Sequence, residues 1–123
     1  MSATVGAEYI IANALLQLQE SGRGSEVSFA KIREIGGNIQ QSCNEKGIDV
    51  IVDCLGRDIV ETVVEYSNYF EFTHYISEDK APMIRLNRRI PLDALRQRFV
   101  NYLPSDVEDV LIAEVKKGLM LSV

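Results

Sequence analysis

The chain contains few of the residues that most often carry catalysis or bind metals. Its 123 residues include only two cysteines and one histidine, His74. A zinc site needs Cys and His grouped at ligand spacing, and a disulfide scaffold of this size needs more cysteines. The sequence also lacks GxSxG, Walker and GxGxxG motifs. We therefore predict no catalytic residue, no metal and no cofactor.

The sequence also lacks a long apolar run. No stretch approaches the ~20 apolar residues that a membrane-spanning helix requires. The first residues do not show the basic start and apolar stretch of a secretory signal. Hydrophobic residues make up 46% and charged residues 25%, both close to globular averages. We expect one soluble, cytoplasmic domain over residues 1–123, with Cys43 and Cys54 as buried free thiols.

Charge is distributed unevenly around a net value of -5. Residues 1–79 carry five Lys and Arg against thirteen Asp and Glu, whereas residues 80–98 carry six against one. The candidate contacts for a partner or for phosphate are Lys80, Arg85, Arg88, Arg89, Arg96 and Arg98. Guanidinium groups suit phosphate because they donate in a planar fork. The same side chains can instead pair with the protein's own carboxylates, and both interpretations stay open.

The first half of the chain reads as mostly helical. Apolar spacing predicts a helix over residues 8–20, ended by the glycines of residues 21–25. Residues 26–29 form a short extended piece, in which Ser28 is a good N-cap for the next helix. Beyond it, Gly36 and Gly37 interrupt a periodic apolar stripe. One long helix and two short helices, as in a helix-turn-helix, both fit this pattern.

Residues 48–55 fit two kinds of secondary structure. Their β-branched run suits a buried strand. The apolar spacing from Ile48 to Tyr66, however, continues one helical face. We favour a helix over residues 49–66, because a long periodic segment outweighs local propensity.

A β-hairpin is predicted over residues 69–87. Alternation places Phe70, Phe72, His74 and Ile76 on one face of the first strand, which we expect to line the edge of the core. That placement removes His74 from the catalytic candidates. Arg85 projects from the opposite face of the second strand.

The last third predicts two further helices. Pro91 suits a first helical position, and Pro104 ends the helix that follows it. Ser105 and Glu108 form a capping box before the final helix, which Gly118 is expected to close. The apolar tail, residues 119–123, needs burial by its own chain or by a second chain.

Together these elements predict a mostly helical α+β domain with one hairpin. The order is helix, short strand, helix, helix, hairpin, helix, helix. Over about residues 7–90 this order resembles that of a winged-helix domain with residues 69–87 as the wing, followed by a helical pair over 91–118. In that comparison residues 49–66 are the recognition helix. Its acidic side chains would be repelled by a phosphate backbone, which favours docking to protein.

Three functions follow from these patterns. The first is a non-enzymatic regulatory or protein-interaction domain that acts as a homodimer, with another protein as an alternative partner and no membrane. The second is a nucleic-acid-binding regulator that uses the basic region 80–98, although the net charge disfavours it. The third is a small enzyme that depends on carboxylates or on Cys54.

Overall fold

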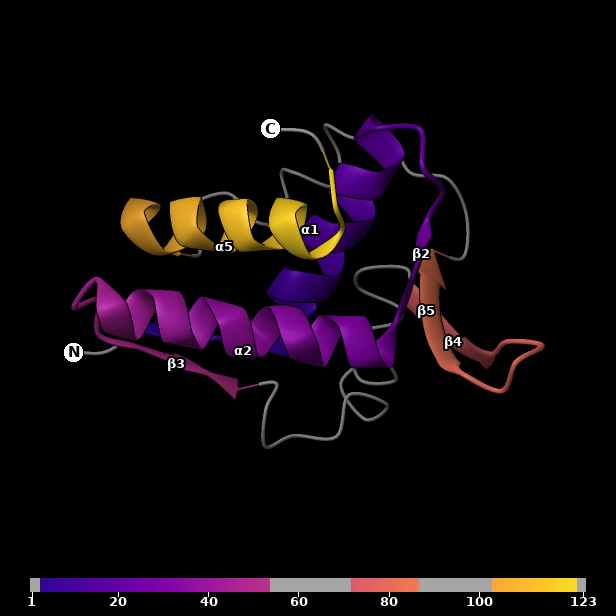
Figure 1. The fold of residues 1–123 in the computed structure, drawn as a ribbon, viewed down its shortest axis with the longest axis horizontal. Coiled ribbons are helices and arrows are strands. Elements are labelled where there is room, and N and C mark those ends of the chain that lie inside the picture. The colour runs from indigo at the N-terminus through magenta and orange to yellow at the C-terminus, as the bar shows by residue number, and fades with distance from the viewer. Residues whose placement is uncertain (1–2, 54–71, 87–102, 122–123) are drawn as a thin grey trace.

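The fold is mixed α+β, as the sequence predicts. A computed structural model describes residues 3–53, 72–86 and 103–121 (Figure 1). In chain order the elements of these ranges are β1 (Ala3–Val5), α1 (Ala7–Glu20), β2 (Glu26–Ser28), α2 (Phe29–Glu45), β3 (Val50–Val52), β4 (Phe72–Ile76), β5 (Pro82–Leu86) and α5 (Ser105–Gly118). Within these ranges, no helix is both long enough and apolar enough to cross a membrane.

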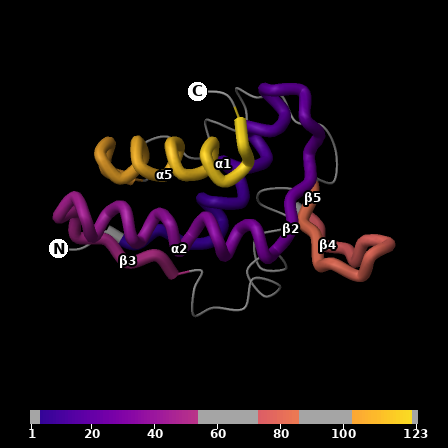
Figure 2. The backbone as a smooth tube through the Cα atoms, viewed as in Figure 1, coloured from indigo at the N-terminus to yellow at the C-terminus, as the bar shows by residue number. Residues whose placement is uncertain are grey.

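The three described helices pack around one apolar core. Helices α2 and α5 lie side by side, and α1 crosses them at an angle and contacts both (Figures 1 and 2). The largest fully buried side chains are Ile10, Ile11, Leu15, Ile32, Ile35, Ile39, Ile84, Leu111 and Val5. Burying one such side chain stabilises the fold by about 1.5–3 kcal/mol, so this core is the main source of stability.

The strands of the described ranges form two small sheets. Strand β1 pairs with β3 in parallel, and the second sheet is antiparallel with the order β2-β5-β4. The predicted helix over 49–66 is wrong at its start, because Val50–Val52 is strand β3. Val50 and Val52 bury their side chains while the backbone pairs with β1. Residues 54–66 lie outside the described ranges, and the winged-helix order is not confirmed.

Helix α2 is continuous. It runs from Phe29 to Glu45 through Gly36 and Gly37. Of the two alternatives that the sequence left open, one long helix is confirmed and two short helices are wrong. The Oγ of Ser28 accepts a hydrogen bond from the backbone N–H of Lys31 at 3.1 Å. This bond confirms Ser28 as the N-cap, since it satisfies one of the unpaired amides of the first turn.

The three described helices all end in the same hydrogen-bonded turn, the Schellman motif. Gly22 and Gly47 take the left-handed position after α1 and α2, with φ of 69° and 70°. After α5 that position is held by Met120, with φ of 58°, so the prediction that Gly118 closes this helix is wrong. Gly118 lies inside α5, where an added Cβ would come 2.6 Å from Cγ1 of Ile35. Glycine is therefore needed there for close packing of α5 on α2.

The start of α5 also differs from the prediction. Ser105 is the first helical residue rather than the cap, and Pro104 takes the cap position without a side-chain hydrogen bond. The backbone carbonyl of Pro104 accepts the N–H of Glu108 instead. The predicted capping box of Ser105 and Glu108 is therefore wrong, because the cap position is at Pro104, one residue earlier.

The apolar tail after α5 is only partly buried. Leu119 packs against the core, whereas Met120 is 81% exposed. Its own chain therefore does not bury Met120, and burial of this residue by a second chain stays a prediction. Residues 122–123 lie outside the described ranges.

Candidate interaction surface

The hairpin of β4 and β5 projects away from the helices at its loop end (Figure 1). Its register pairs His74 with Ile84 and Ile76 with Pro82, so these four residues share one face. Ile84, on the central strand, is fully buried, but His74 and Pro82 are exposed and Ile76 is 62% exposed. The expectation that His74 and Ile76 line the core is wrong, because outer strand β4 extends beyond the cover of the helices.

The loop of the hairpin is held by Ser77. Its N–H donates to the carbonyl of Ala81 at 3.0 Å, and its carbonyl accepts the N–H of Lys80 at 2.9 Å. The hydroxyl of Ser77 also donates to the carboxylate of Asp79. This bond favours the charged carboxylate and lowers the pKa of Asp79 below its ordinary value. Lys80 takes the left-handed conformation, with φ of 64°, where glycine is usual.

The opposite face of the sheet carries a polar cluster. The guanidinium carbon of Arg85 lies 4.9 Å from the centroid of the Tyr75 ring. The hydroxyl of Tyr75 donates a hydrogen bond to the carboxylate of Glu26 on β2. This bond raises the pKa of Tyr75, because the phenolate form cannot donate it. Arg85 is therefore held within its own sheet, where the pairing of β2 with β5 places it opposite Glu26.

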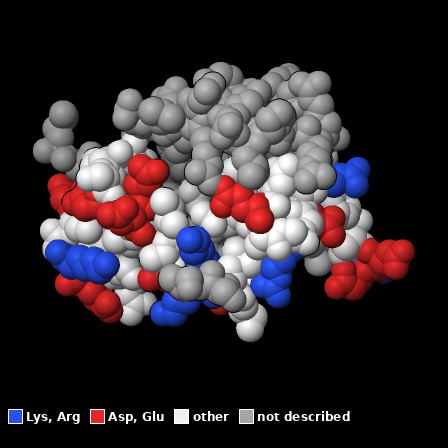
Figure 3. Space-filling view, turned by 90° about the horizontal axis from the view of Figure 1, so that it is seen from above, with Lys and Arg blue, Asp and Glu red and all other residues white. Residues whose placement is uncertain are grey.

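Two of the six predicted basic contacts fall within the described residues. Lys80 and Arg85 are both exposed, but Lys80 is in the loop and Arg85 is on β5. The projecting end of the hairpin also carries Glu78 and Asp79, and acidic atoms are visible there in Figure 3. The other four candidates lie outside the described ranges: Arg88, Arg89, Arg96 and Arg98. That the six form one binding strip stays a prediction.

Within the part of the chain that the structure describes, strand β4 is an unprotected sheet edge. Among the described strands it pairs only with β5, on one side. Its five residues, Phe72–Ile76, include no Asp, Glu, Lys, Arg or Pro. Natural edge strands usually carry such residues, because bare backbone groups attract further strands. This edge could not be predicted from the sequence, because the alternation of side chains predicts which face of a strand each residue lies on. It gives no information about which edge of the sheet is left unpaired.

The outer edge of β3 is covered, in contrast. The side-chain amide of Gln40 on α2 donates to the carbonyl of Val50 at 3.0 Å and accepts the N–H of Val52 at 2.9 Å. One side chain therefore supplies the two hydrogen bonds that a neighbouring strand would make. Ile51, between them, is 54% exposed.

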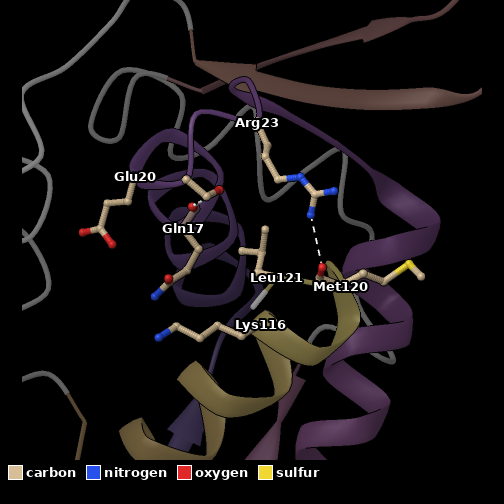
Figure 4. A pocket seen from close by; sticks show the side chains of 7 residues that line it. Gln17, Glu20, Arg23, Lys116, Met120 and Leu121 are labelled. Atoms are coloured by element: carbon tan, nitrogen blue, oxygen red, sulfur yellow. Dashed lines mark hydrogen bonds between the residues drawn. The ribbon is translucent and has the colours of Figure 1, made fainter. Parts of the chain in front are cut away.

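A groove of about 460 Å³ lies where the C-terminal ends of α1 and α5 meet (Figure 4). It is lined by Gln17, Glu20, Ser21, Arg23, Lys116, Met120 and Leu121. Arg23 reaches across it and donates to the carbonyl of Met120 at 3.1 Å. A cation at this position complements the negative end of α5. We interpret the contact as a structural link between the two helix ends.

The described residues offer little support for a catalytic function. Cys43 is buried as predicted, and burial, with a smaller contribution from nearby Asp106, raises the pKa of its thiol. A raised pKa disfavours the reactive thiolate. Within the described ranges no three His, Cys, Asp or Glu side chains are grouped to hold a metal ion. Cys54, the other thiol considered, lies outside these ranges.

Comparisons with protein families, with curated proteins and with solved structures find no match for this chain.

Proposed function

We propose that this chain is a non-enzymatic protein-interaction domain that acts as a homodimer, with the β4–β5 hairpin as its working surface. The observation that supports this best is the unprotected edge of β4 beside the 62% exposed side chain of Ile76. Exposed strand edges bind other strands through backbone hydrogen bonds. The exposed apolar side chain next to this edge adds to the binding free energy, because a partner would remove its surface from water.

A protein partner suits this surface better than a nucleic acid. Strand β4 contains no cation, and the hairpin loop carries Glu78 and Asp79 next to Lys80. Arg85 is stacked on Tyr75 beside Glu26. Phosphate binding depends on unshared positive charge, and the described hairpin offers little of it. A five-residue edge is also small, so we expect weak association in the micromolar range.

The test uses two exposed isoleucines on different sheets. Ile76→Lys places a charge on the projecting hairpin, and Ile51→Lys is the matched control on β3, with similar exposure. Light scattering over a micromolar concentration series measures the dimer fraction. We expect wild type and the Ile51→Lys variant to dimerise, and the Ile76→Lys variant to dimerise about 10-fold more weakly or worse.

Two results would overturn the proposal. One is a wild-type chain that stays monomeric throughout the series. The other is retardation of a DNA or RNA oligonucleotide at low salt that disappears in the double variant Arg88→Glu, Arg89→Glu, which would support the nucleic-acid alternative instead.

A further inference from the structure

The backbone groups that β4 leaves unpaired can be assigned from its register. In an antiparallel ladder, hydrogen-bonded and non-hydrogen-bonded pairs alternate. The bond from Ser77 N–H to the carbonyl of Ala81 makes that pair a hydrogen-bonded one. Counting back along β4, Tyr75 and Thr73 direct their N–H and C=O groups towards β5. The outward groups therefore belong to Phe72, His74 and Ile76.

Proline on the neighbouring strand agrees with this assignment. Pro82 lies opposite Ile76 and has no N–H to donate. The pair is therefore compatible only with the non-hydrogen-bonded position. The outward N–H and C=O of Ile76 are then directed to the free side of the sheet.

We propose that β4 pairs antiparallel with β4 of a second copy of this chain, about a two-fold axis at His74. This inference rests on the proposed function and adds the partner strand and its register. His74 pairs with His74 of the second copy, and Phe72 pairs with Ile76 of the second copy. Every outward-facing residue of one strand then meets an outward-facing residue of the other, and each such pair exchanges two hydrogen bonds.

The side chains of β4 are compatible with this register. Because the strand carries no Asp, Glu, Lys or Arg, the pairing places no like formal charges opposite each other. Tyr75 comes beside Thr73 of the second copy. Pairs of aromatic with β-branched residues stabilise antiparallel sheets. The two three-stranded sheets then become one continuous sheet.

Charge distinguishes a second copy from a basic partner. Each copy has a net charge of -5, so two copies repel each other at long range. Added salt screens this repulsion, and self-association should therefore strengthen as salt rises. Binding of a basic peptide or of a nucleic acid through the arginines would weaken with salt instead.

Cross-linking tests the register directly. In the proposed pairing the two His74 Cα atoms lie about 5.5 Å apart, within disulfide range. The two Thr73 Cα atoms lie roughly 8 Å apart, which is beyond that range. We expect His74→Cys to form a disulfide-linked dimer in air at least 10-fold faster than the control variant Thr73→Cys. Mass spectrometry of the linked peptides separates this bond from any through Cys43 or Cys54.

The outcomes separate the register from the proposed function. Light scattering on the reduced variants, at low and high salt, reports dimerisation independently of the disulfide. If the reduced protein dimerises but Thr73→Cys cross-links as fast as His74→Cys, the register is wrong and the homodimer stands. Reduced protein that is monomeric at all concentrations overturns both. Association that weakens as salt rises overturns pairing between two copies of β4.

Discussion

The outer edges of β3 and β4 differ in whether their backbone groups have hydrogen-bond partners. On β3 the side-chain amide of Gln40 donates to the carbonyl of Val50 and accepts from the N–H of Val52. On β4 no described residue outside β5 pairs with the backbone, and the strand itself carries no charge or proline. The covered edge lies against α2, and the bare edge lies on the projecting hairpin (Figure 1). Ile51 and Ile76 are similarly exposed, but of their two strands only β4, which carries Ile76, has backbone groups left free by the described residues to bind another strand.

The largest effect is expected from uncovering the edge of β3. Gln40→Ala leaves the carbonyl of Val50 and the N–H of Val52 without their partner, in a partly buried position. We expect the free energy of unfolding to fall by about 2 kcal/mol. Urea denaturation measures this change. Gln40→Ala should also allow self-association through the uncovered edge of β3. Adding Ile76→Lys to this variant should not suppress that association, because Ile76 is on β4.

Gln41 provides the matched control. Its side-chain amide donates a hydrogen bond to the carboxylate of Glu45 at 3.3 Å, on the exposed side of the same helix. Gln41→Ala should change the free energy of unfolding by less than about 0.5 kcal/mol. Equal losses in the two variants would mean that Gln40 stabilises the helix and not the edge of β3.

A smaller effect is expected at the hairpin loop. Lys80→Gly relieves the left-handed conformation at φ of 64°, and it should raise the free energy of unfolding by about 0.5–1 kcal/mol. Lys80→Ala is the control, because it removes the charge and keeps the Cβ. Urea denaturation of both variants measures the difference. A gain shared by alanine would assign the effect to charge instead of backbone conformation.

The smallest effect is the pH dependence of the same loop. The hydroxyl of Ser77 lowers the pKa of Asp79, so the ionised carboxylate is stabilised in the folded state. This contribution is present above the ordinary Asp pKa and is lost as the pH falls through the lower, folded-state value. An NMR titration of the Asp79 carboxyl should show its pKa moving up in Ser77→Ala. An unchanged titration would show that the hydroxyl does not stabilise the carboxylate.

Local sequence pattern was enough to predict α1, β2 and the hairpin. Each depends on neighbouring residues: apolar spacing in α1, the N-cap at Ser28, and alternation around the loop after Ile76. Strand β3 was predicted as helix because its partner, β1, is far away in the sequence. The spacing of its apolar residues is compatible with either structure, and only the distant pairing decides between them.

The candidate surface was predicted in part. Alternation correctly placed His74 and Ile76 on one face of β4, but it could not show where the helices stop covering that face. The cover of Gln40 over β3 leaves no pattern in the sequence, since Gln on a helix surface is ordinary. The close approach of Gly118 to Ile35 likewise depends on how two distant helices pack.

The position of α5 has a consequence for synthesis of the chain. Val110, Leu111 and Val115 complete the core that α1 and α2 begin, and Arg23 bonds to Met120 from 97 positions earlier. Until α5 has emerged from the ribosome, the apolar faces of α1 and α2 have no cover from it. Exposed apolar surface of this kind is what chaperones bind in nascent chains. Release of the last turn of α5 is therefore the step that allows the helical core to close.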